Sequence, residues 1–343
     1  MSGLFALGVS LAIAPLSAEA RIAPTLRGRV VDAQTGRPMT NDWRGEGLVL
    51  ARDGRTGRIH AWTSDGTPLP GVVPPGGGWT RLGAHRGYAL PLAVREGRLH
   101  HTTGLVTPPW RPAEGQATTA SWVTGPGLAV PRALIGTETF VLALEPDGQG
   151  VQVSVFQELE ALARGQAVAL LADRRYDTTE LLPGGVGRIE CLTTGPGDRT
   201  VLLIGRTPAG AGLVRWPVVL GVFDRVPQWL SLPWLLTEVT ACAATGHDPA
   251  QFGSGFVYLI REDGPMLRLT LRQWRLGDGP PETLQPAGVP ARVTGLAVAR
   301  LRRHVEAVYA VAGDEAVYRF SVDGVADQRI EWSLPGGSPR SAP

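Results

Sequence analysis

The stretch from Val293 to Gly324, VTGLAVARLRRHVEAVYAVAGDEAVYRFSVDG, decides the fold. It holds three successive segments in which apolar residues alternate with others, and the apolar positions are rich in β-branched and aromatic side chains. Alternation of this kind predicts a β-strand. Gly313-Asp314-Glu315 and Asp323-Gly324 lie where hairpin turns would join such strands. The stretch therefore predicts three consecutive antiparallel strands.

The same order of three segments occurs twice more, upstream. In each unit a short opening segment is followed by a strongly apolar segment and then by a segment that bears arginine. The opening segments are Arg188–Gly195, Glu238–Gly246 and Arg292–Arg300; the apolar segments are Thr200–Gly205, Gly255–Ile260 and Glu306–Val311; the arginine-bearing segments are Leu213–Pro217, Leu267–Arg272 and Ala316–Ser321. Internal repetition of this length predicts an array of similar sheets.

The whole chain fits a single β-propeller. Two hairpins, Gly47–Gly66 and Thr139–Phe156, show the same rhythm less regularly in the N-terminal half. A four-stranded blade needs roughly 40 to 50 residues, so 343 residues suit about seven blades, with six or eight left open. We expect one all-β propeller domain over residues 1–334, because blades bury their faces only by stacking radially. Residues 335–343 read as a flexible C-terminal tail.

Two segments have competing interpretations. Residues 156–173 fit either a helix or two strands, and Gly165 favours the strands. At the N-terminus, Leu4–Leu16 is apolar and Ala18-Glu19-Ala20 resembles a signal-peptidase site, but no positive charge precedes them. We therefore favour two strands of a first blade at 3–9 and 11–14 and a cytoplasmic protein, with secretion after cleavage near Ala20 as the alternative.

Composition excludes several classes of function. All 33 basic residues are arginine, so there is no lysine for a Schiff base or for a phosphate-binding P-loop. A net charge of +2, with arginine spread along the chain, does not favour a nucleic-acid partner. No apolar run is long enough to predict a membrane-spanning helix.

The two cysteines have similar surroundings, Glu190-Cys191-Leu192-Thr193-Thr194-Gly195 and Ala241-Cys242-Ala243-Ala244-Thr245-Gly246. We interpret them as equivalent core positions of neighbouring repeats, acting as small buried hydrophobic residues in preference to a disulfide. No CxxC pair or histidine cluster accompanies them, so the sequence predicts no zinc site.

The units resemble the WD-repeat blades of GC-rich bacteria. Those blades carry a Val-Arg-Val-Trp-Asp core before a turn of the Thr-Gly-Arg-Pro type, and Arg29–Pro38 matches this with Val31 at the Trp position. Ile59–Gly66 keeps the Trp but has Thr63 in place of Asp, and Val214–Pro217 keeps the Trp alone. The resemblance implies a binding platform. Gly28–Pro38 also resembles the first strands of carboxypeptidase-regulatory-like sandwich domains, a match that stops at Pro38.

The sequence predicts no catalytic residue, cofactor or metal. Gly253-Ser254-Gly255 lacks the spacing of a nucleophile elbow and precedes a strand instead of a helix. His100 and His101 would point to opposite faces of a strand, so they would not chelate one ion together.

Candidate partner-binding residues come from charged and tryptophan-bearing stretches. Asp173–Asp177 is the densest charged cluster, for which we expect a solvated loop with internal ion pairs, or alternatively a partner-binding rim. Arginine and tryptophan are favoured at protein interfaces. The candidates are Arg174, Arg175, Tyr176, Trp110, Trp229, Trp234, Arg302 and Arg303. The tryptophans would serve as anchors if exposed and as wedges between blades if buried.

Two functions follow from this reading. The first is a non-catalytic, WD-repeat-like scaffold or regulatory module that binds another protein through its loop-bearing face, as a subunit of a larger bacterial assembly. The alternative is a secreted propeller that binds or cleaves a carbohydrate or another extracellular ligand.

Overall fold

The computed structural model describes only part of the chain. The described residues are 19–23, 30–31, 38–39, 48–52, 57–63, 71, 73–85, 90–102, 122–137, 140–158, 168–195, 200–219, 222–223, 227–245, 255–262, 266–272, 275–276, 282–284, 293–302, 305–312, 316–321 and 326–331. The N-terminal strands expected at 3–9 and 11–14 and the tail 335–343 lie outside these residues, and so do residues 159–167.

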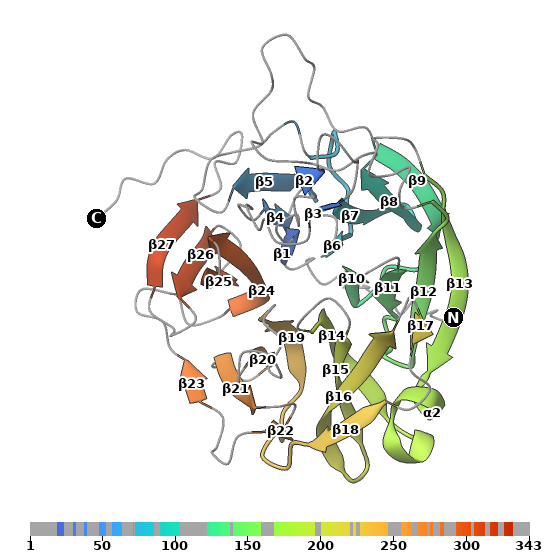
Figure 1. The fold of residues 1–343 in the computed structure, drawn as a ribbon, viewed down its shortest axis with the longest axis vertical. Coiled ribbons are helices and arrows are strands. Elements are labelled where there is room, and N and C mark those ends of the chain that lie inside the picture. Colours follow the sequence, from blue (N-terminus) through green and yellow to red (C-terminus); the bar gives the residue numbers. More distant parts are fainter. Residues whose placement is uncertain are drawn as a thin grey trace, which may run out of the picture.

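The described strands form a β-propeller, as the sequence predicts (Figure 1). Six innermost strands surround the centre, namely β1 (Glu19–Ala23), β6 (Arg81–His85), β10 (Ala133–Thr137), β14 (Arg188–Thr194), β19 (Val239–Ala244) and β24 (Val293–Arg302). Each contacts the next, and β1 contacts both β6 and β24, so the ring is closed. The described residues thus form six blades, whereas the sequence favours about seven and leaves six or eight open.

Each innermost strand begins an antiparallel blade. Blade 1 adds β4 (Leu48–Arg52) and β5 (Ile59–Thr63); blade 2 adds β7 (Leu90–Arg95), β8 (Arg98–Thr102) and β9 (Trp122–Gly127); blade 3 adds β11 (Phe140–Leu144), β12 (Gly150–Phe156) and β13 (Leu170–Asp177). Blade 4 adds β15 (Thr200–Thr207), β16 (Gly210–Val219), β17 (Val222–Phe223) and β18 (Gln228–Ser231); blade 5 adds β20 (Gly255–Arg261), β21 (Met266–Arg272), β22 (Arg275–Leu276) and β23 (Glu282–Leu284); blade 6 adds β25 (Val305–Ala312), β26 (Ala316–Ser321) and β27 (Ala326–Glu331).

Three short elements lie outside this pattern. β2 (Val30–Val31) and β3 (Pro38–Met39) pair with each other in a two-stranded sheet, within the segment that resembles a WD-repeat core. A four-residue helix, α2 (Thr178–Leu181), follows β13, and the 3-10 turn η2 (Pro183–Gly185) leads on to β14.

Apolar packing between blades explains why the inner strands read as continuous apolar runs. On β15, Val201 and Leu203 pack into a cluster with blade 3, whereas Leu202 and Ile204 pack into a cluster with blade 5. Successive side chains of a strand point to opposite faces, and here both faces are covered by a neighbouring blade. The three units recognised in the sequence are blades 4, 5 and 6.

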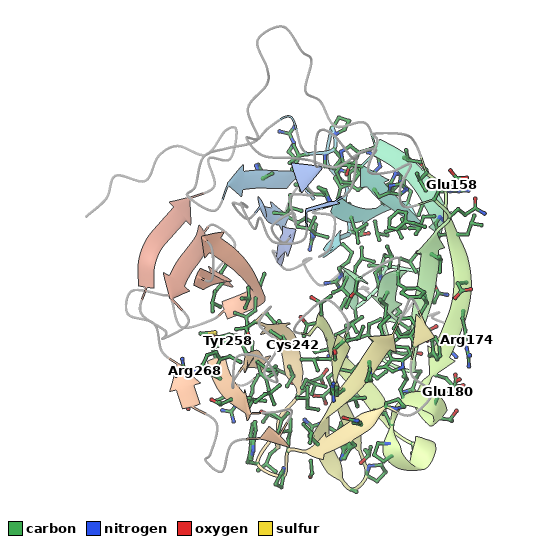
Figure 2. The ribbon with its side chains drawn as sticks, viewed as in Figure 1. Glu158, Arg174, Glu180, Cys242, Tyr258 and Arg268 are labelled. Atoms are coloured by element: carbon green, nitrogen blue, oxygen red, sulfur yellow. A yellow bond between two sulfur atoms is a disulfide. The ribbon has the colours of Figure 1, made fainter. Side chains whose placement is uncertain are left out.

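The innermost strands of blades 4 and 5 are covalently joined. Cys191 on β14 and Cys242 on β19 form a disulfide with a Cα–Cα distance of 6.1 Å, and both residues are buried (Cys242 is labelled in Figure 2). The prediction that they occupy equivalent core positions is confirmed, but the preference for two unlinked thiols is wrong. Equivalent positions on adjacent inner strands face each other across the blade interface, which brings the two sulfur atoms together.

A buried ion pair reinforces the same interface. The Glu190 side chain on β14 is fully buried and accepts a hydrogen bond from Arg206 Nε at 2.5 Å, while its other oxygen accepts one from the Val239 backbone N–H at 3.0 Å. Arg206 also donates to the carbonyl oxygens of Leu235 at 3.1 Å and Thr237 at 2.7 Å, which fixes the segment that leads into β19. A buried carboxylate needs such compensation, because desolvation otherwise destabilises its charged form.

A second acidic residue extends the network to blade 3. Glu238 accepts from Arg188 Nη at 2.7 Å and also pairs with Arg132, which immediately precedes β10. Partial burial acts to raise the pKa of Glu238, but the hydrogen bonds and charges of Arg132 and Arg188 outweigh it and hold that pKa below its usual value. Three consecutive blades are therefore tied together where their innermost strands begin.

Removing the disulfide should lower stability markedly. The two cysteines are 51 residues apart, and cross-linking such a long loop restricts the unfolded chain, so we expect the variant C191S/C242S to lose about 2–4 kcal/mol of unfolding free energy. Urea unfolding of both proteins with and without reductant measures this. Reductant should weaken the parent protein and leave the variant unchanged; equal stability of parent and variant would contradict the assignment.

Candidate functional site

The charged cluster predicted as a loop is part of a strand. Residues 173–177 complete β13, the outermost strand of blade 3. These residues are polar because they lie exposed at the edge of the sheet, and this polarity led to the prediction of a loop. The expected internal ion pairs are present. Arg175 binds both carboxylate oxygens of Glu145, at 2.6 and 2.7 Å, and Arg174 pairs with Glu180 of α2 at the outer edge of the propeller (Figure 2).

Tyr176 packs within the molecule. Its ring meets the ring of Trp216 on β16 edge to face, with centroids 4.7 Å apart, and Phe223 stacks on Trp216 at 4.2 Å. The guanidinium of Arg174 lies over the tyrosine ring, 4.2 Å from its centroid. Burial raises the pKa of Tyr176, and nearby Arg174 opposes that shift. This side chain therefore joins blade 3 to blade 4.

The other predicted partner residues divide into described and undescribed ones. Trp229 on β18 is half-buried and lies over Gly212, where an added Cβ would come within 2.2 Å of its ring. Trp234 is half-buried against the core between blades 4 and 5. Arg302 ends β24, and its side chain lies outside the described part of the chain. Trp110 and Arg303 also lie outside the described residues.

One face of blade 2 carries polar and aromatic side chains that the sequence did not bring together. Across β8 and β9, His100 pairs with Thr124 and Thr102 pairs with Trp122, so all four lie on the same face. The next residue, His101, points the opposite way and meets Phe156 of blade 3 edge to face at 5.2 Å. The prediction that the two histidines point to opposite faces is confirmed.

Trp79 covers this face. Its backbone N–H donates to the Gly57 carbonyl at 3.1 Å, just before β5 of blade 1. Its ring lies edge-on to His100 at 5.1 Å and tilted against Trp122 at 5.8 Å, and the Arg95 guanidinium lies 4.9 Å from its centroid. We call Trp79, Arg95, His100 and Trp122 the Trp79 cluster. It lies on blade 2 where a turn of blade 1 approaches.

The cluster contains hydrogen-bonding groups without partners. The indole Nε1 atoms of Trp79 and Trp122 and the hydroxyl of Thr102 are buried, and each lacks a hydrogen-bond partner in the structure as described. A buried polar group left in this way costs about 1–3 kcal/mol. Trp79 itself is only 3% exposed, whereas Trp122, His100 and Arg95 are half-exposed around it. Solvent therefore reaches the margin of the cluster, and the unpaired donors lie just inside.

Electrostatics keep the cluster histidine neutral. Burial lowers the pKa of His100, and the positive charge of Arg95 lowers it further; a weaker effect of Glu96 opposes them. At neutral pH the imidazole is therefore uncharged and Arg95 is the cation of the cluster.

Sequence reasoning missed this site because its four members come from four separate segments. Trp79 precedes β6, Arg95 ends β7, His100 lies within β8 and Trp122 opens β9. The one sequence signal for Trp79 is its position directly after three glycines, Gly76-Gly77-Gly78, and in the structure its side chain is buried.

Two negative findings apply to the described residues. They contain no group of three or more His, Cys, Asp or Glu side chains arranged to hold a metal ion. Of the helices within the described ranges, none is sufficiently long and apolar to span a membrane.

Comparison with known proteins supports the fold. The chain resembles the solved structure of the lectin from Aleuria aurantia, described as a six-bladed β-propeller with a novel fucose recognition mode, with a TM-score of 0.55, 13% identity and coverage of 94% of this chain and 98% of that one. The chain is a β-propeller. AofleA from Arthrobotrys oligospora gives a TM-score of 0.55 at 11% identity, covering 93% and 87% of the two chains. A chain of a nidogen/laminin complex gives 0.51 at 8% identity, covering 82% and 92%.

No family model matches the sequence, and no curated protein matches it either. The resemblance to WD-repeat blades therefore extends to the propeller fold and no further.

The buried histidines predict how stability depends on pH. Burial lowers the pKa of His101 as well as that of His100, so the unfolded chain, with histidine near 6.5, takes up protons first as the pH falls. Stability should fall below about pH 6.5 and level off once both folded imidazoles are charged. Urea midpoints between pH 7.5 and 5.5 measure this. The variant His101→Phe, which keeps an aromatic ring against Phe156, should show a shallower decline, and an unchanged slope would contradict the assignment.

Proposed function

We propose that this protein is a non-catalytic, carbohydrate-binding β-propeller and that the Trp79 cluster forms a binding site. The observation that carries the proposal is the pair of tryptophans 5.8 Å apart, both with unpartnered indole N–H groups, beside a half-exposed histidine and arginine.

The chemistry of the cluster suits a sugar. A sugar ring offers apolar C–H faces and many hydroxyl oxygens, so its binding sites need both aromatic surface and convergent hydrogen-bonding groups. Tryptophan supplies both in one side chain. Trp122, which is partly exposed, offers ring surface to a ligand, and Arg95 offers donors to its oxygens. The two unpaired N–H groups lie buried beneath this surface, and a ligand would have to uncover them to use them.

The solved structures with similar folds lend further support. Aleuria aurantia lectin has been solved in complex with Fucα1-6GlcNAc, and its fold resembles this chain with a TM-score of 0.52 at 13% identity over 94% and 98% of the two chains. At such low identity the likeness shows only the fold, and fucose recognition is a property of that lectin. A fold shared with a sugar-binding propeller is our reason for preferring carbohydrate binding to the scaffold function expected from WD-repeat blades.

The predicted protein-binding surface has less support. Those of its residues whose side chains are described make contacts within the chain. Arg174 and Arg175 pair with glutamates, and Tyr176 packs on Trp216. Trp229 packs against Gly212 of β16. Nothing in these contacts favours a protein partner on the loop-bearing face.

We further propose that the protein works in an oxidising compartment outside the cytoplasm. The Cys191–Cys242 disulfide supports this, because structural disulfides persist mainly in such compartments. Glu19 and Ala20 of β1 pair with Arg52 and Ala51 of β4. Cleavage directly after Ala20 would therefore shorten the innermost strand of blade 1. The mass of the protein recovered from its native host tests both points.

A glycan-binding panel tests the proposed function. We expect the wild-type protein to bind a subset of immobilised neutral and acidic glycans, and Trp122→Ala to lose most of that binding because it removes both ring surface and donor. Trp229→Phe is the matched control, since it changes another half-exposed tryptophan on an outer strand two blades away.

Circular dichroism and urea unfolding must show that both variants remain folded. Absence of binding to every glycan, or full binding by a folded Trp122→Ala variant, would overturn the proposal.

A further inference from the structure

We propose that the Trp79 cluster selects an acidic saccharide, a sugar whose carboxylate is held by Arg95 and by the indole N–H groups. This inference rests on the proposed function and specifies the class of ligand. It would set this site apart from one that recognises a neutral sugar.

The first observation is an arrangement of like charges. Arg95 at the end of β7 and Arg98 at the start of β8 are directly opposite each other in the sheet. The two-residue turn between them, Glu96-Gly97, has positive φ angles of 52° and 70°, which is the geometry of a tight hairpin and fixes this register. Like charges directly opposite each other destabilise a sheet. An anion bound beside them would relieve that repulsion.

Only one acidic side chain offsets these arginines among the described residues of the turn and the cluster. Glu96 approaches Arg95 at 3.6 Å, but its side chain is 83% exposed, so water screens the attraction. Arg98 is exposed and lies on the same face of β8 as His100, two residues away. The two arginines and Glu96 therefore leave an excess of positive charge beside the cluster.

The second observation is the kind of hydrogen-bonding group on this face. The indole N–H groups of Trp79 and Trp122 are donors only and lack partners, and guanidinium groups also donate only. An ionised carboxylate accepts hydrogen bonds and donates none. A neutral sugar hydroxyl, by contrast, needs an acceptor for its own proton, and of the three unpaired groups on this face only the Thr102 hydroxyl can accept.

Trp79 lies close to both other groups. Its ring centroid is 5.8 Å from that of Trp122 and 4.9 Å from the guanidinium carbon of Arg95. A carboxylate beside Arg95 can accept a charge-assisted bond from the guanidinium, whose planar fork matches its two oxygens. The sugar ring would then lie toward half-exposed Trp122. The positive charge of Arg95, which helps to keep His100 neutral, would attract the carboxylate of the ligand.

A matched pair of ligands tests the inference. Trigalacturonate and its fully methyl-esterified form have the same sugar rings, and only the former is charged. Calorimetric titration of the wild-type protein should give at least tenfold weaker binding for the ester. Binding of the acid should weaken further as salt is raised, because screening reduces attraction between partly exposed charges, whereas binding of the ester should respond little.

Two variants separate recognition of the charge from general damage. Arg95→Gln should reduce the affinity for trigalacturonate about to that for the ester and should leave the affinity for the ester unchanged. Arg174→Gln, which removes an exposed arginine from blade 3, is the matched control and should alter neither affinity. Because Arg95 also packs on Trp79, the variant Arg95→Gln could unfold, and Arg98→Gln is then measured in its place. It should lower the affinity for trigalacturonate by a smaller factor and leave the affinity for the ester unchanged.

The outcomes distinguish this inference from the proposed function. Equal affinity for the acid and the ester, binding of neutral fucosides in preference to the acid, or selective binding of a sulfated disaccharide would overturn the acidic-sugar inference and leave carbohydrate binding intact. Failure to bind any of these sugars, together with a blank glycan panel, would overturn both.

Discussion

Closure of the ring of innermost strands is the constraint on which the rest of the structure depends. Blade 4 is apolar on both faces, as β15 shows by sending Val201 to one neighbour and Leu202 to the other, so this blade would expose a large apolar surface without two neighbours. Contact of β1 with both β24 and β6 removes the two free ends that an open array would have. The propeller is therefore stable as a ring and not as separate blades.

The strongest local interactions lie where blades 3, 4 and 5 meet near the centre. The buried Glu190–Arg206 pair and the Cys191–Cys242 disulfide both involve β14, the innermost strand of blade 4. Breaking a buried ion pair is costly, because the remaining charge stays desolvated. These interactions hold the inner strands rigidly, and the outer strands carry the half-exposed side chains from which a binding site can be built.

The sequence predicts the fold well where a segment is buried on both sides. Thr200–Gly205 and Gly255–Ile260 are recognisable because packing on two faces demands an apolar side chain at nearly every position. β13 was misread over 173–177 because an outermost strand faces solvent and resembles a loop. The disulfide could not be deduced from similar surroundings of two cysteines, because the pairing depends on the distance between adjacent blades, which no local pattern encodes.

The candidate site was harder still to predict, because its residues meet only through tertiary structure. Trp79 reaches His100 and Trp122 by crossing the face of blade 2 from the segment before β6, and its place is fixed by a backbone hydrogen bond to Gly57 in blade 1. The site also includes two arginines, Arg95 and Arg98, that lie opposite each other. This pairing can be recognised only once the register between β7 and β8 is known. Of the partner-binding residues predicted from charge, Arg174 and Arg175 instead pair within the chain.

The most direct test of this account is an NMR titration that observes the indole N–H groups of the ten tryptophans, assigned through tryptophan-to-phenylalanine variants. Hydrogen bonding to a ligand shifts an indole proton resonance strongly downfield. Trigalacturonate should shift the indole N–H resonances of Trp79 and Trp122 and leave those of Trp229 and Trp234 in place. Shifts confined to Trp229 and Trp234, or none at saturating ligand, would contradict it.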